Sequence, residues 1–254
     1  MLNTEGNYKI EVMNNIFKVF HQDLLPPDHY KFLEFLSDSL HFKPSVIYDI
    51  GSAVLHWERH AKRIWTDSNI ICFDAFSPLE DLDKHCNVKH HVACLSDQDE
   101  VEQKFYQNDR LFGGNSLFRE IGFDNGSVFP EENYILKQTQ TLDKIVKDNN
   151  YMYPDLIKID AQGGELNILK GATECLNHAS YLIAELQNVE YNKGAVLAPV
   201  VITYLTTIGW ILLFSKFSDN GPDADYCFVN ASKAGSWIFS LGLDTLKARD
   251  WMKK

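Results

Sequence analysis

The chain has 254 residues and a formal net charge of -11, from 35 acidic and 24 basic side chains. This excess of acid disfavours binding to duplex nucleic acid or to an anionic membrane surface, because both need clustered lysine and arginine. Hydrophobic residues make up 45% of the sequence and aromatic residues 13%, which predicts a packed globular core. A chain of this length buries enough surface to be stable without disulfides or metals.

Neither a secretory signal nor a membrane-spanning segment is recognisable. Residues 1–25 lack a basic start, a continuous apolar stretch and a small-residue cleavage site. No uncharged run approaches the roughly 20 residues that a membrane span needs. The 5 cysteines form no C-x-x-C pair, which favours a reducing compartment. We therefore expect a cytoplasmic protein with free cysteines.

Helices and strands are predicted to alternate along most of the chain. Residues 1–44 are expected to be helical, with apolar residues at helical spacing after Pro26 and Pro27. Short apolar runs predict strands at 46–51, 69–76, 89–96, 155–164, 180–187, 210–217 and 225–230. Helices are predicted at 55–65, 141–148, 165–176 and 198–209, whereas residues 105–130 show no clear period.

This alternation predicts an α/β fold, with a mostly parallel sheet and helices on both faces. The last two strands lack a helix between them, so we expect them to form an antiparallel hairpin at one edge of the sheet. The sheet domain is predicted to span residues 45–231. Residues 1–44 are expected to be an N-terminal extension of it, and residues 232–254 a C-terminal helical tail.

Acidic residues mark the predicted carboxyl ends of the strands, where such sheets bind ligands. Asp49, Gly51 and Ser52 end the first strand, and Asp74 ends the second. A small-residue turn lets backbone amides approach a ligand, and a carboxylate roughly 20 residues further on can accept the hydroxyl hydrogens of a ribose. A helix cap or an ordinary turn explains the same residues equally well. The G-x-G-x-x-G pattern of a dinucleotide site is absent.

The fourth predicted strand carries a lysine and an aspartate on one face. Lys158 and Asp160 are two residues apart, and a lysine within an apolar strand needs a paired charge. Asp160, Glu165 or Glu185 can supply it. The pair is interpreted either as a structural ion pair or as a general base held by the lysine.

Two further groups of polar residues have competing interpretations. His56 and His60 lie four residues apart but lack the H-E-x-x-H order of a zinc protease, so we expect a solvated helix face and not a metal site. The segment FGGNSLF at 112–118 has paired glycines between apolar residues. It is typical either of a lid or of an ordinary surface loop.

The segment DLIKIDAQGGELNILKGA resembles the hallmark of FkbM-type S-adenosylmethionine-dependent methyltransferases. The resemblance extends to TLDKI, to NSL in the preceding loop and to YLIAELQNVEYNKGA, and it runs from about Val46 to Asn230. It implies the Rossmann-like class I methyltransferase fold, a seven-stranded sheet with an antiparallel last hairpin. It also implies O-methyl transfer to a hydroxyl, above all of a sugar. The expected partner is a small-molecule or glycan acceptor, with neither nucleic acid nor membrane involved.

Matched by position, the resemblance suggests roles for individual residues. S-adenosylmethionine is expected to contact Asp49, Gly51, Ser52, Asp74 and Ser96. The expected catalytic residues are Asp160 as the base, Lys158 orienting it, and Glu185. The expected acceptor-binding residues are Asn115, Ser116, Glu165 and Gln187. Carboxylates at neighbouring strand ends are also able to hold a divalent metal, although the sequence does not require one.

The first loop departs from the family pattern D-x-G-A-N-x-G. Ser52 replaces alanine, Ala53 replaces asparagine and Leu55 replaces the second glycine. We expect the bulky Leu55 side chain to narrow the pocket for the methionine part of the cofactor. Two alternatives follow: a degenerate module that binds a glycan or protein, and a nucleotide-dependent oxidoreductase. The missing glycines and the final hairpin count against the second.

Overall fold

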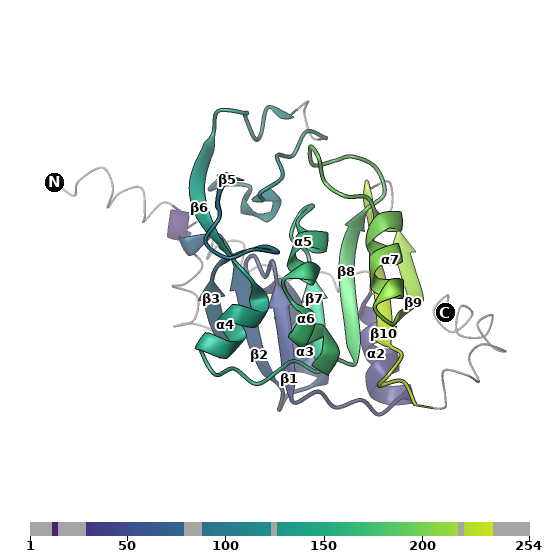
Figure 1. The fold of residues 1–254 in the computed structure, drawn as a ribbon. Coiled ribbons are helices and arrows are strands. Elements are labelled where there is room, and N and C mark those ends of the chain that lie inside the picture. The colour runs from purple at the N-terminus through teal and green to yellow at the C-terminus, as the bar shows by residue number, and fades with distance from the viewer. Residues whose placement is uncertain (1–11, 15–28, 79–87, 123–125, 218–220, 236–254) are drawn as a thin grey trace.

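The computed structural model describes residues 12–14, 29–78, 88–122, 126–217 and 221–235. Residues 236–254 of the tail predicted at 232–254, and most of the predicted N-terminal extension, lie outside the described residues. The predicted domain boundaries therefore stay predictions. The described part forms a seven-stranded sheet, a smaller three-stranded sheet and helices on both faces of the larger sheet (Figure 1). None of the described helices has the length and apolar character needed to cross a membrane.

The large sheet has the order β3-β2-β1-β7-β8-β10-β9. Its strands are β1 (Val46–Ile50), β2 (Asn69–Asp74), β3 (Lys89–Val92), β7 (Leu156–Ile159), β8 (Tyr181–Gln187), β9 (Trp210–Phe217) and β10 (Asp223–Asn230). Strand β10 runs antiparallel to both β8 and β9, and the other neighbouring strands are parallel. The predicted fold class and the antiparallel last hairpin are confirmed.

Apolar residues alternate between the two faces of this sheet and are covered by different helices. One core joins Tyr48 and Ile50 to the helices α4 (Leu142–Asp148), α5 (Glu165–Lys170), α6 (Thr173–His178) and α7 (Ala198–Thr207). The other joins Ile47 to α2 (Tyr30–Glu34), the π-helical turn η1 (Phe35–Ser39) and α3 (His56–Ile64). The described cysteines Cys72, Cys94, Cys175 and Cys227 are all buried, and Cys94, Cys175 and Cys227 are free, as predicted.

The smaller sheet was not predicted from the sequence. The segment 89–96 leaves the large sheet after Val92, and β4 (Cys94–Leu95) pairs instead with β6 (Tyr134–Gln140), which also pairs with β5 (Glu102–Tyr106). Most of β6 is exposed to solvent. It therefore lacks the buried apolar run or strict alternation by which strands are recognised in a sequence.

The prediction of one helix over 165–176 was wrong. Helix α5 ends at Lys170 and α6 begins at Thr173. Gly171 lies between them, packed so closely against the loop after β4 that a Cβ there would be 2.1 Å from the carbonyl oxygen of Ser96. This close packing brings the loop after β4 against the junction between α5 and α6.

Candidate active site

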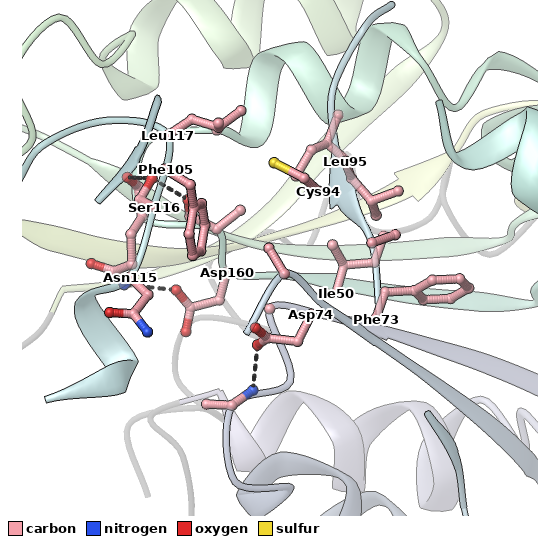
Figure 2. A pocket seen from close by; sticks show the side chains of 18 of the residues that line it. Ile50, Phe73, Asp74, Cys94, Leu95, Phe105, Asn115, Ser116, Leu117 and Asp160 are labelled. Atoms are coloured by element: carbon pink, nitrogen blue, oxygen red, sulfur yellow. Dashed lines mark hydrogen bonds between the residues drawn. The ribbon is translucent and has the colours of Figure 1, made fainter. Parts of the chain in front are cut away.

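A cavity opens at the carboxyl ends of β1, β2 and β7, next to the smaller sheet (Figure 2). Its wall is formed by the ends of β1 and β2, the residues around β4, Phe105 of β5, the segment with the 3-10 turn η3 (Phe112–Gly114), the loop after β7, and Ile168 of α5. The predicted site residues on this wall are Gly51, Asp74, Asn115, Ser116 and Asp160.

The turn after β1 brings the backbone very close to the loop after β7. Gly51 has a φ angle of 72°, and a Cβ at this position would lie 1.6 Å from the carbonyl oxygen of Asp160. The amides of Gly51 and Ser52 both donate to the carbonyl of Phe73, at 2.8 and 3.3 Å. Only glycine fits this turn, which joins the ends of β1, β2 and β7.

Asp74 lies at the edge of the cavity, with its carboxylate fixed by two backbone amides. Its Oδ2 accepts from the amide of Ala53 at 2.9 Å (dashed in Figure 2), and its Oδ1 accepts from the amide of Phe76 at 2.8 Å. Burial raises the pKa of Asp74, and the two amides oppose that effect. Each carboxylate oxygen has a second lone pair, so Asp74 is still able to accept from a ligand.

Leu55 occupies the position of the second family glycine without narrowing the cavity. Ala53 and Leu55 both have left-handed backbone angles, with φ of 43° and 59°. The turn therefore keeps a conformation that glycine adopts at little cost. The Leu55 side chain is fully buried in the core beside α3 and is not part of the cavity wall. The expectation that it narrows the methionine pocket was wrong.

Asp160 follows β7 and is held by three neighbours. Its amide donates to the carbonyl of Ile50 at 2.9 Å. Its Oδ2 lies 3.3 Å from the Nζ of Lys158, and its Oδ1 accepts from the Nε2 of Gln162 at 2.8 Å. Gln162 also donates to the Oε1 of Glu185 at 3.3 Å. The carboxylates of Asp160 and Glu185 are thus bridged by one amide group.

The buried charges of this region shift one another's protonation. Burial acts to lower the pKa of Lys158, but the carboxylates of Asp160 and Asp49 outweigh it and raise that pKa, so the lysine stays charged. Burial raises the pKa of Asp49 to about 6, although Lys158, 3.7 Å away, opposes this. The charge of Asp160, followed by burial, raises the pKa of Glu185 well above its usual value.

Comparisons with known proteins agree with this geometry. Residues 52–212, more than half of the chain, match the Methyltransferase FkbM domain. The chain belongs to the FkbM methyltransferase family. The resemblance seen in the sequence is confirmed, and with it S-adenosylmethionine as the cofactor. A search of curated proteins gives no match.

Solved structures similar to this FkbM methyltransferase include enzymes named for different methylation reactions. A putative O-methyltransferase from Klebsiella pneumoniae is 12% identical, with 87% of this chain and 89% of that chain covered and a TM-score of 0.44. The N-methyltransferase NodS from Bradyrhizobium japonicum WM9, in complex with S-adenosyl-L-homocysteine, is 11% identical, with 86% and 98% covered and a TM-score of 0.42. Precorrin-6y C5,15-methyltransferase from Geobacter metallireducens GS-15 is 10% identical, with 78% and 87% covered and a TM-score of 0.42.

The cavity of this FkbM methyltransferase fits S-adenosylmethionine chemically. Asp74 offers a carboxylate at one end, Phe73, Leu95 and Phe105 form an apolar wall, and Asp160 offers a second carboxylate (Figure 2). Apolar walls with a few fixed polar groups are typical of cofactor sites. Within the described ranges, no three His, Cys, Asp or Glu side chains are grouped to hold a metal ion.

All three residues of the NSL motif, Asn115, Ser116 and Leu117, lie on the cavity wall (Figure 2). Asn115 Oδ1 accepts from the amide of Asn108 at 2.7 Å, whereas its Nδ2 has no hydrogen-bond partner among the described residues. The neighbouring Ser116 instead donates to backbone carbonyls of the loop after β7. Asn115 Nδ2 is therefore a buried donor that no described residue uses.

The other predicted site residues are not among those that line the cavity. They are Asp49, Ser52, Ser96, Lys158, Glu165, Glu185 and Gln187. Ser96 is fully buried and donates to Asp97, and the buried Gln187 bonds to Asn192. Their assignment to catalysis or to binding stays a prediction.

Sequence reasoning missed Lys137, which extends from β6 toward the loop after β2. Its Nζ donates to the carbonyl of Ala75, the residue after Asp74, and lies 5.1 Å from the ring centroid of Phe105. Burial lowers the pKa of Lys137. It escaped prediction because the smaller sheet, which brings it to the cavity, was itself not predicted.

The helix face that carries His60 is buried, so the prediction of a solvated face was wrong. His60 and Glu58 are 5% and 3% exposed. Burial and the charge of Asp49 raise the pKa of Glu58 to about 8. Glu58 is therefore protonated in the folded protein at neutral pH, whereas an unfolded glutamate is ionised.

We expect Glu58→Gln to stabilise the protein at high pH. The folded pKa exceeds the unfolded one, so the free energy of unfolding falls as pH rises from about 4.5 to about 8. Glutamine removes that dependence, and we expect a gain of about 1–3 kcal/mol at pH 8 and little change at pH 5. Urea unfolding of the wild type and of Glu58→Gln at both pH values measures this gain in the free energy of unfolding. Glu102→Gln, at an exposed position, is the control. A Glu58→Gln effect that is equal at both pH values contradicts this account.

Proposed function

We propose that this FkbM methyltransferase transfers a methyl group to a hydroxyl of a sugar or glycan, with Asp160 as the general base. One observation carries the proposal: the Asp160 carboxylate, fixed by Lys158 and Gln162, shares the cavity wall with Asn115, whose Nδ2 has no hydrogen-bond partner among the described residues. A fixed acceptor of protons next to a free donor suits a hydroxyl, which must be both held and deprotonated.

The proposed roles follow from this arrangement. S-adenosylmethionine supplies a methyl group on a positively charged sulfur, which carboxylate-lined walls favour. Asp160 accepts the proton of the acceptor hydroxyl, and Lys158 and Gln162 keep its carboxylate in place. Asn115 Nδ2 donates to an acceptor oxygen, and Asp74 accepts from the cofactor ribose. The acceptor is a small molecule or glycan, without a nucleic-acid or membrane partner.

The alternative of a degenerate glycan- or protein-binding module rested on the altered first loop. The burial of Leu55 away from the cavity removes one part of that reason, whereas Ala53, which replaces the family asparagine, lines the cavity. Cofactor binding distinguishes the proposed methyltransferase from the degenerate binding module. The proposed enzyme binds S-adenosylhomocysteine in calorimetry, whereas a wild-type chain that fails to bind it at millimolar concentration is not the proposed enzyme.

Asp160→Asn tests the assignment of the base. We expect transfer of tritiated methyl groups to a panel of sugars, glycans and hydroxylated small molecules to fall by about 100-fold or more. The affinity for S-adenosylhomocysteine should change by less than about threefold, because asparagine keeps the size of the side chain and one acceptor oxygen. Asp67→Asn, at an exposed position, should leave both unchanged. Full turnover in Asp160→Asn would exclude Asp160 as the base.

A further inference from the structure

The loop that follows β7 cannot pair all of its backbone N–H and C=O groups within itself. Gln162 and Gly163 have φ angles of 50° and 101°, outside the helical and extended regions. The amide of Asp160 bonds to Ile50 and the amide of Gly164 to the carbonyl of Ala161. Other buried polar groups of the loop need partners from elsewhere, because an unpaired buried backbone group is costly.

Glu165 supplies the partners on one side of this loop. Its Oε1 accepts from the amide of Ala161 at 2.9 Å and from the amide of Gly163 at 3.1 Å. Glu165 is 2% exposed and is not among the residues that line the cavity. Burial raises the pKa of its carboxyl to about 7, while both amides favour the ionised form. Its side chain is therefore oriented toward the loop and not toward an acceptor.

Ser116 supplies the partners on the other side. Its Oγ lies 2.8 Å from the carbonyl oxygen of Gln162 and 3.1 Å from that of Ala161, and it accepts from the amide of Phe118 at 3.0 Å. The backbone of Ser116 pairs with Tyr106 at the end of β5. Ser116 thus fastens the segment 107–122, which we call the cover segment, to the loop that carries Asp160.

The cover segment is itself braced from β8. Asn192 Nδ2 donates to the carbonyl of Phe118 at 2.7 Å, and Gln187 Nε2 donates to the Oδ1 of Asn192. Gln187 Oε1 also accepts from the amide of Asn192 at 3.1 Å. The position of Ser116 is therefore set by contacts independent of the loop that it holds.

We propose that Glu165 and Ser116 are positioning residues that clamp the Asp160 loop from opposite sides and so fix the direction of the Asp160 carboxylate. This inference rests on the proposed function, since it makes both residues holders of the base and not ligands of the acceptor. Glu165 holds the amides of Ala161 and Gly163. Ser116 holds the carbonyls of Ala161 and Gln162. The side chain of Gln162, whose backbone is held in this way, bonds to the carboxylates of both Asp160 and Glu185.

Amide hydrogen exchange measured by NMR tests the clamp without requiring an acceptor. In Glu165→Ala, we expect the amides of Ala161 and Gly163 to exchange at least about tenfold faster, because both lose a charged acceptor. Glu165→Gln keeps an oxygen in the same place and should restore exchange to within about threefold of the wild type. Ser116→Ala, a smaller change, should speed exchange at Phe118.

Asp143→Ala is a matched control. The Asp143 carboxylate likewise accepts two backbone amides, from Glu174 at 2.8 Å and Cys175 at 3.0 Å, but it does so between α4 and α6. Its replacement should speed exchange at those two amides and leave the Asp160 loop unchanged. The control separates a local clamp from a general loss of stability.

A second measurement reports on Asp160 itself. The charge of Asp160 is the main reason why the pKa of Glu185 is raised. If the clamp fixes Asp160, the pKa of Glu185, followed by carbon NMR, falls toward its usual value in Glu165→Ala and Ser116→Ala but not in Asp143→Ala.

Unchanged exchange at Ala161 in Glu165→Ala, together with an unchanged Glu185 titration, overturns the clamp. So does a folded Glu165→Gln that behaves like Glu165→Ala, because a role that needs the charge is then indicated. Absence of S-adenosylhomocysteine binding to the wild type refutes the proposed function and leaves the exchange results standing.

Discussion

Replacing Gly51 by alanine should abolish cofactor binding and destabilise the fold. The added Cβ would lie 1.6 Å from the carbonyl oxygen of Asp160 and 2.6 Å from its carbonyl carbon, and these are backbone atoms that cannot rotate away. Overpacking costs about 1–3 kcal/mol and a left-handed non-glycine residue about 1 kcal/mol more. We expect a loss of about 3 kcal/mol in the free energy of unfolding, measured in urea. Affinity for S-adenosylhomocysteine should fall at least about 100-fold, because the turn and the Asp160 loop must separate.

Gly113→Ala is the matched control, because Gly113 lines the same cavity. A Cβ at Gly113 meets nothing within 4 Å. Both the stability and the affinity for S-adenosylhomocysteine should stay close to the wild-type values, within about 0.5 kcal/mol, as for other unobstructed surface substitutions. Wild-type affinity in Gly51→Ala would show that the close approach of the two loops does not shape the cofactor site.

Lys158→Met should cost about 3–5 kcal/mol at pH 7, because buried Asp49 loses its counterion and must either keep an uncompensated charge or take up a proton. Asp49 is fully buried, and neither carboxylate oxygen has a hydrogen-bond donor among the described residues. Its ion pair with Lys158 is the compensation that the structure shows. Asp160 loses the same partner, so the variant should also impair methyl transfer more than it impairs cofactor binding.

The cost of Lys158→Met should depend on pH. Burial already raises the pKa of folded Asp49 from 3.8 to about 6, and removing the lysine raises it further. A group whose folded pKa is raised in this way destabilises the fold increasingly as pH rises through the interval. Urea unfolding should therefore show a smaller loss at pH 5 than at pH 8.

Two further variants make this prediction specific. Adding Asp49→Asn to Lys158→Met removes the uncompensated charge and should recover most of the lost stability. Lys144→Met breaks an exposed ion pair with Asp148 and should cost less than about 1 kcal/mol. If the double variant is no more stable than Lys158→Met alone, the loss comes from packing and not from charge.

The large sheet was predictable because its central strands are buried on both faces and appear as continuous apolar runs. In β1 every residue from Val46 to Ile50 is buried. The smaller sheet left no such signal, since β6 is largely exposed. The break at Gly171 was missed for another reason: it depends on contact with Ser96, a residue distant in the chain. Local patterns do not report contacts of this kind.

The candidate site was predictable as a set of strand ends and much less as a set of side-chain directions. Gly51, Asp74 and Asp160 lie on the cavity because parallel strands end at one edge of the sheet. Glu165 and Gln187 were expected beside them, but both are turned toward backbone amides and neighbouring loops. Spacing places a residue near the edge of a sheet. Only packing determines whether it points to the ligand or supports the loops around it.

The path from the large sheet to the smaller one determines how ligands reach the cavity. Ala93 alone separates β3 from β4, and its amide is bonded to the carbonyl of Asp74 at 2.9 Å. A hinge needs residues whose backbone angles are free to change. The single residue between β3 and β4 is held by its bond to Asp74 and does not have this freedom. We therefore expect the smaller sheet to stay in place during ligand exchange. We then expect ligand entry and exit to involve loops of the cavity wall such as the Phe112–Gly114 turn, so that substitutions there change the rate of product release more than substitutions in the sheets.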